Sequence, residues 1–102
     1  MLAYIKNYGE RVCAHSRREK IGSHENVPTV NAPYQDLSTH LNMLLEQSGA
    51  PFVAGYFRRA DGKWQFSLRS TKDFDCSEVA KSFGGGGHAQ ASGFEVDKLP
   101  WG

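Results

Sequence analysis

The sequence is poor in cysteine and has no long apolar run. Cys13 and Cys76 are its two cysteines, and their separation fits neither a CxxC motif nor the ligand spacing of a metal site. Such sparse cysteine favours a reduced, intracellular chain over a disulfide framework. No stretch approaches the length of a membrane span, and the first residues lack the apolar core of a signal peptide. We therefore expect a soluble, cytoplasmic protein.

An excess of charge of one sign is also missing. Lysine and arginine number 12 against 11 aspartates and glutamates, which gives a formal net charge of +1. A dedicated duplex-DNA binder is usually more basic than this, so any contact with nucleic acid should be local. The 102 residues suffice for one domain with a core and are too few for two. The chain also has no internal repeat, low-complexity tract or coiled-coil heptads.

The first 26 residues are predicted to form a leading helix and a linker. Apolar residues recur at helical spacing from Met1 to Val12, which indicates a helix over residues 1–20. Five basic and two acidic side chains lie between residues 6 and 20, and a solvated helix face explains them more simply than a nucleic-acid patch. His15 and His24 have no further ligands at metal spacing, so we interpret both as surface residues.

The remaining chain alternates between strand and helix patterns. The helix over 35–47 carries a leucine stripe and also His40, which we expect at the edge of the core or within it. The second and third strands are separated by Asp61-Gly62, a turn signal, and so predict an antiparallel hairpin. Asp75 with Glu78 three residues later resembles a capping box and starts a short helix that ends near residue 83. The expected elements are strand 27–32, helix 35–47, strands 52–57 and 63–69, helix 75–83 and strand 93–96.

This order of elements predicts the fold class. Alternating strands and helices with one hairpin in the middle indicate an α/β domain, a mixed β-sheet with a central antiparallel hairpin flanked by helices. The whole chain is expected to form this single domain.

Four consecutive glycines followed by His88 are the most informative stretch of the sequence. A run of glycines is often no more than a flexible loop, but this one is closely held between a predicted helix and a predicted strand. Glycines also let the main chain approach a ligand, so the amides of Gly85, Gly86 and Gly87 could converge on a phosphate. A helix turn opening near His88 would add further donors, and the imidazole could donate a hydrogen bond to a phosphoryl oxygen.

These residues resemble the DHH-associated C-terminal domain of DHH-family phosphoesterases, of the oligoribonuclease and phosphoadenosine-phosphate phosphatase types. The resemblance covers about residues 27–97. The family usually has alanine where Ser92 stands, and a Glu-x-Gly pairing where Thr39 and Leu41 stand. The matching segments are Val30–Pro33, Pro51–Ala54, Phe66–Ser70, Val79–Phe83, Gly84–His88 and Ala91–Phe94.

The resemblance implies a substrate-binding site. In the family, the arginine of the matching Ser-Leu-Arg-Ser segment contacts substrate, which assigns that role to Arg69; from the residues alone, a solvent-facing arginine at the end of a strand is the simpler interpretation. The predicted substrate-binding residues are Arg69, Ser70, Gly84, Gly85, Gly86, Gly87 and His88.

The resemblance also implies what this chain lacks. Family members hydrolyse phosphoesters in a separate N-terminal domain, whose Asp-His-His triplet and other residues hold divalent metal, commonly manganese. No Asp-His-His triplet occurs in the sequence, and its acidic residues do not pair with histidine at ligand spacing. We therefore expect no catalytic residue, metal site or cofactor in this chain. It is either part of a longer enzyme or a stand-alone relative without the catalytic half.

Three functions remain open from the sequence. The favoured one is a module that grips the phosphate of a short single-stranded oligonucleotide or nucleotide while a DHH domain in the same or another chain cuts it. The second is a complete enzyme with His88 as general acid or base, although no nucleophile is evident. The third is an RNA-binding or self-associating module, because similar domains end alanyl-tRNA synthetases, and a homo-oligomer would suit it. Tyr34, Tyr56 and Phe94 could stack on a base, but core packing explains each more simply.

Overall fold

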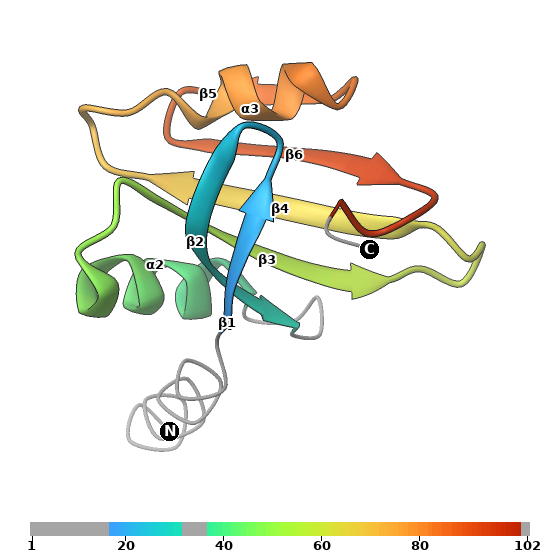
Figure 1. The fold of residues 1–102 in the computed structure, drawn as a ribbon, viewed down its shortest axis with the longest axis horizontal. Coiled ribbons are helices and arrows are strands. Elements are labelled where there is room, and N and C mark those ends of the chain that lie inside the picture. Colours follow the sequence, from blue (N-terminus) through green and yellow to red (C-terminus); the bar gives the residue numbers. More distant parts are fainter. Residues whose placement is uncertain (1–16, 32–36, 101–102) are drawn as a thin grey trace.

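A computed structural model describes residues 17–31 and 37–100. Within these residues the chain forms a six-stranded mixed sheet with two helices (Figure 1). The strand order is β1-β2-β3-β4-β6-β5, with β2 and β3 parallel and the other neighbours antiparallel. This confirms the predicted α/β class. The elements are β1 (Arg17–Ile21), β2 (His24–Asn31), α2 (Leu37–Ser48), β3 (Phe52–Arg58), β4 (Trp64–Ser70), α3 (Cys76–Ser82), β5 (Gly86–His88) and β6 (Ala91–Val96).

The predicted hairpin lies in the middle of the sheet. β3 and β4 pair in antiparallel register from Phe52 opposite Ser70 to Arg58 opposite Trp64. The connection turns at the predicted residues, where the Gly62 N–H donates to Arg59 O at 3.0 Å. Of the alternating apolar residues of β4, Phe66 and Leu68 are fully buried and Trp64 is half-buried.

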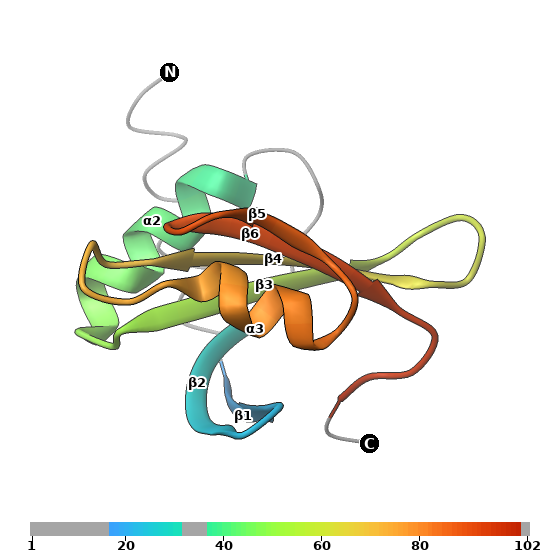
Figure 2. The same cartoon turned by 90° about the horizontal axis from the view of Figure 1, so that it is seen from above.

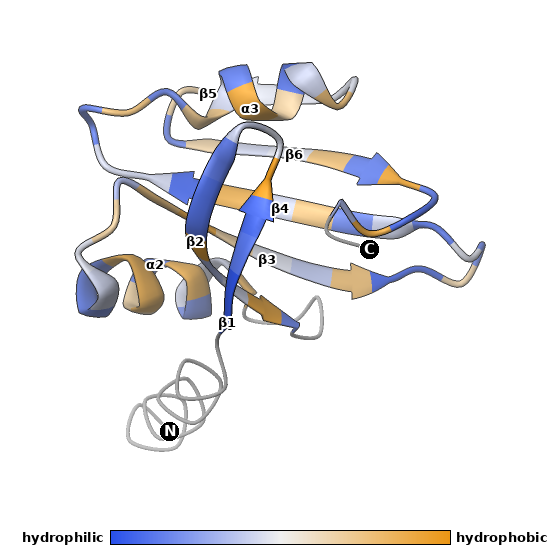
Figure 3. Ribbon diagram, in the orientation of Figure 1, coloured by the Kyte–Doolittle hydropathy of each residue, from blue (hydrophilic) through white to orange (hydrophobic). Residues whose placement is uncertain are grey.

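Different elements cover the two faces of the sheet. α2 lies on one face, where it packs with Val30 of β2 and Val53 of β3. On the opposite face, α3 and the hairpin of β1 and β2 close over the larger core cluster (Figure 2). The first half of β2 and all of β1 except its last residue are hydrophilic (Figure 3), whereas that last residue, Ile21, is buried in the core.

α2 approaches the sheet closely. Gly55 of β3 has no side chain, and a Cβ there would lie 2.8 Å from Leu37 Cδ1 and 3.0 Å from Leu41 Cδ2. The glycine therefore sets how near the helix can come. His40 is fully buried on the core side of α2, which confirms its predicted place.

The predicted cap of α3 is confirmed. Asp75 is the N-cap, and its Oδ1 accepts a hydrogen bond from the Ser77 N–H at 3.0 Å. The Ser77 hydroxyl also donates to the same carboxylate oxygen. This second bond is the main reason that the pKa of Asp75 lies below its ordinary value.

The first part of the chain differs from the prediction. Residues 17–20, expected to end a helix, belong to strand β1, and the predicted helical residues 1–16 lie outside the described residues. Charged residues have little strand preference of their own, but β1 pairs with β2 along its length, and this pairing decides the conformation. β2 begins at residue 24, three residues before the predicted strand.

His24 is half-buried, which corrects its interpretation as a surface residue. Its ring meets those of Phe52 and Phe74 edge-on, at centroid distances of 5.3 and 5.5 Å. His15 lies outside the described residues, as does Tyr34. Neither described helix is both long enough and apolar enough to cross a membrane.

Candidate functional site

The glycine segment forms an edge strand. Gly86 to His88 make up β5, which pairs with β6 so that Gly86 lies opposite Gly93 and His88 opposite Ala91. The expected helix turn at His88 is wrong, because the chain turns back at residues 89–90 and continues as β6. The strand conformation of residues 86–88 depends on pairing with β6, which the local sequence does not reveal.

The first two glycines of the segment end α3. Gly84 has a φ of +85°, in the left-handed region that glycine adopts without strain, and its N–H donates to Lys81 O at 3.0 Å. The Gly85 N–H donates to Ala80 O at 2.8 Å. These bonds satisfy carbonyl groups at the end of the helix, so both amides already have partners inside the domain.

Close contact with β6 explains two of the four glycines. A Cβ on Gly85 would lie 2.2 Å from Gly93 O, and one on Gly87 would lie 2.7 Å from Ser92 Cα. Gly87 also has a φ of +145°. Any side chain at either position would collide with the neighbouring backbone.

Gly86 has no such explanation. A Cβ at this position would meet no atom within 4 Å, and its φ lies outside the left-handed region. Among the glycines of residues 17–31 and 37–100, it alone combines open space with an ordinary backbone conformation. Neither the space around Gly86 nor its backbone conformation therefore requires glycine.

Arg69 and His88 flank one small residue. Ala91 of β6 lies opposite Arg69 of β4 on one side and opposite His88 of β5 on the other. Residues directly opposite share a face of the sheet, so both side chains belong to the same face. At the usual spacing of strands their Cα atoms are about 10 Å apart. The structure thus brings two of the predicted residues into one row.

Glycines line the next row of the same face. Gly93 of β6 lies between Ser67 of β4 and Gly86 of β5. Together with Ala91, these small residues form the surface of the sheet beside Arg69 and His88. His88 is exposed and Arg69 is half-buried.

Arg69 faces α2. Its pairing partner on β3, Val53, packs in the apolar core cluster beneath that helix. One guanidinium nitrogen, Nη1, donates to Leu68 O at 2.8 Å, and the other, Nη2, donates to Ser38 Oγ of α2, also at 2.8 Å. Ser38 was not among the predicted site residues, and an exposed serine in the first turn of a helix gives no signal of such a contact in the sequence.

Ser70 lies on the other face of β4. It is 6% exposed, and its hydroxyl lies 2.7 Å from Phe74 O and 3.0 Å from Ala89 O. The Cys76 N–H also donates to Ala89 O, at 2.8 Å, and the Ser70 N–H donates to Gln90 O at 3.2 Å. Ser70 therefore helps to fix the turn that immediately follows His88.

Ser92, which departs from the usual family residue, has a partner. Its buried hydroxyl donates to the Sγ atom of Cys76 at 3.1 Å, so the thiol accommodates the additional oxygen. At the other departure, Thr39 is exposed, whereas Leu41 is buried against Gly55.

Within the described ranges, no three His, Cys, Asp or Glu side chains are grouped so that they could hold a metal ion. The described residues therefore do not fit a manganese ion.

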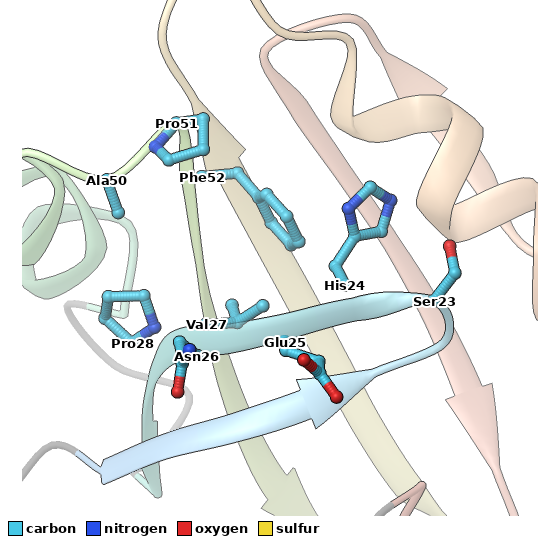
Figure 4. A pocket seen from close by; sticks show the side chains of 9 residues that line it. All are labelled: Ser23, His24, Glu25, Asn26, Val27, Pro28, Ala50, Pro51 and Phe52. Atoms are coloured by element: carbon cyan, nitrogen blue, oxygen red, sulfur yellow. The ribbon is translucent and has the colours of Figure 1, made fainter.

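A groove that the sequence did not indicate lies elsewhere. It has a volume of about 220 Å³ and opens between the start of β2 and the start of β3 (Figure 4). His24 and Phe52 line it, and none of the predicted site residues does.

Comparison with known protein families identifies the domain. The family model of the DHHA1 domain matches residues 26–100. The chain belongs to the DHHA1 family. The matched stretch includes the glycine segment, Arg69 and His88, so the row described above lies within the part that this DHHA1 domain shares with its family. A comparison with curated proteins gave no match.

Solved structures share the fold. An exopolyphosphatase-related protein from Bacteroides fragilis matches with a TM-score of 0.70 and 22% identity over 93% of this chain and 30% of that one. An uncharacterized protein from Helicobacter pylori G27 matches with a TM-score of 0.57 and 22% identity, over 99% of this chain and 27% of that one. A pGpG-specific phosphodiesterase from Vibrio cholerae matches with a TM-score of 0.61 and 10% identity, over 93% of this chain and 34% of that one. The DHHA1 domain thus spans about a third or less of the proteins that it resembles.

Proposed function

We propose that this DHHA1 domain grips a phosphate group of a short single-stranded oligonucleotide or nucleotide. The observation that carries the proposal is the shared row of Arg69 and His88 around Ala91, next to Gly86, the glycine of residues 84–87 that neither crowding nor a positive φ requires. A guanidinium can bind a phosphate with two hydrogen bonds, and an imidazole can donate one more. A phosphate placed above Ala91 would lie between the two residues in this row.

The backbone contributes at Gly86. β5 is the last strand of the sheet, and an edge strand has backbone groups that do not pair with a neighbouring strand. With no side chain at Gly86, a ligand can approach this edge closely. The Gly84 and Gly85 amides take no part in the proposal, because they already donate to α3 carbonyls. Ser70 contributes by holding the turn after His88.

Hydrolysis belongs to another domain in this proposal. In the DHH family a separate catalytic domain holds manganese, and the solved relatives are about three times as long as this chain. The DHHA1 domain would hold the substrate while that domain, in the same or another chain of the cytoplasm, cuts the phosphoester. A dinucleotide is a suitable probe, since one protein of the same fold is a pGpG-specific phosphodiesterase.

An amide NMR titration of the 102-residue chain tests the proposal. We expect a 5′-phosphorylated ribodinucleotide to shift the amide signals of residues 84–88 and those around Arg69, with no product formed in the same tube, with or without manganese. The same dinucleotide without its 5′-phosphate is the control and should bind more weakly. Shifts elsewhere, or none, would refute the site. Manganese-dependent turnover would instead show that the chain carries its own catalytic residues.

A further inference from the structure

The guanidinium of Arg69 is held by α2. Of its two terminal nitrogens, one donates to its own strand at Leu68 O, and the other to Ser38 Oγ, each at 2.8 Å. An arginine side chain has many rotamers, and ordering it on binding costs affinity. Two bonds, one to β4 and one to α2, restrain the planar group before any ligand arrives.

We propose that Ser38 is a positioning residue for Arg69, an assignment that rests on the proposed phosphate site. Its hydroxyl accepts a hydrogen bond from Nη2, and three of the five N–H donors of the guanidinium are left for other partners. Ser38 acts on the ligand through the arginine. The inference adds α2 to a site that the sequence placed only on strands and on the glycine segment.

The close packing of α2 against the sheet makes the contact between Ser38 and Arg69 possible. Leu37, the residue before Ser38, lies directly over Gly55, where a Cβ would come within 2.8 Å of its Cδ1 atom. Gly55 lies on β3, two residues from Val53, the partner of Arg69 in the ladder. The close approach of the helix therefore brings its first turn within hydrogen-bond distance of the arginine.

A double-mutant cycle tests the assignment through affinity for the 5′-phosphorylated ribodinucleotide. Ser38→Ala should raise the Kd about three- to tenfold, the usual effect of one lost hydrogen bond. Ser38→Thr keeps a hydroxyl and should restore most of the affinity. In the Arg69→Ala background, Ser38→Ala should have no further effect. Thr39→Ala, which changes the next exposed residue of the same turn, is the matched control.

A second measurement needs no ligand. Ser38→Ala should release one guanidinium nitrogen, so NMR of the Arg69 side chain in the free protein should show faster rotation of the Nη groups. Unchanged rotation would overturn the inference, as would equal losses of affinity from Ser38→Ala with and without Arg69. If rotation accelerates but Arg69→Ala binds the dinucleotide normally, Ser38 positions the arginine and the proposed phosphate site is what fails.

Discussion

The four glycines of residues 84–87 serve different purposes, although the sequence presents them as one run. Gly84 ends a helix, Gly85 and Gly87 allow β6 to lie close, and Gly86 faces open space. A single motif thus combines residues that the fold needs with one that it does not need. Substitutions can separate the two roles.

Gly86→Val should abolish binding of the 5′-phosphorylated dinucleotide while leaving the domain folded. A Cβ at this position meets no protein atom within 4 Å, and valine suits a strand, so thermal unfolding should change little. The side chain would, however, occupy the space proposed for the ligand. Ala60→Val adds similar bulk at the far, β3–β4 end of the sheet and is the control. Full-strength binding by Gly86→Val would disprove the role of this glycine.

Gly85→Ala is the complementary change. Its Cβ would lie 2.2 Å from Gly93 O and 2.6 Å from Phe94 Cβ, so β5 or β6 must shift. Overpacking of this kind costs about 1–3 kcal/mol in the free energy of unfolding. Chemical denaturation should therefore separate Gly85→Ala from Gly86→Val, and equal stability of the two would contradict the division of roles.

At the scale of elements, the sequence predicted those whose local pattern and packing agree. The alternation of Trp64, Phe66 and Leu68 predicted β4, and the leucine stripe predicted α2. The sequence did not predict strands β1 and β5, because Arg17–Lys20 and Gly86–His88 have little strand preference of their own. Their conformation depends on pairing with other strands. For the same reason the sequence identified Arg69 and His88 as candidate site residues but could not predict that they lie in one row on either side of Ala91.

The cap of α3 predicts a dependence of stability on pH. The pKa of Asp75 is lowered, chiefly by the Ser77 hydroxyl, so the ionised form stabilises the folded state above the unfolded pKa of about 4. That stability should be lost as pH falls through the lower folded pKa. Asp75→Asn keeps a capping side chain but removes the titration, so its melting temperature should fall less between pH 5 and pH 2.

The measurement is thermal unfolding of wild type and variant over that pH range. Asp73→Asn removes an exposed carboxyl group from the same loop and is the control. Parallel curves for wild type and Asp75→Asn would show that the cap does not titrate as the structure indicates.

At the scale of the whole molecule, both helices and the β1–β2 hairpin leave one part of the sheet lined by small and polar residues. α2 covers β3 on that face, whereas Ser67, Ala91 and Gly93 lie beyond it. The opposite face is closed by the larger core. With a net charge of +1, the chain has no general electrostatic attraction for nucleic acid, so the proposed binding depends on this local patch.

Salt dependence distinguishes such a patch from an extended nucleic-acid surface. Each phosphate contact with a single strand contributes a slope of about −0.7 to a plot of log K against log salt concentration. One phosphate held by Arg69 and His88 should thus lose only about two- to threefold in affinity between 50 and 200 mM salt. A slope several times steeper would mean many phosphate contacts, as in an RNA-binding module related to those of alanyl-tRNA synthetases. Arg69→Ala removes the permanent cation of the proposed site, so it should flatten a shallow slope almost completely; a steep slope, which reflects many cations, should change only slightly.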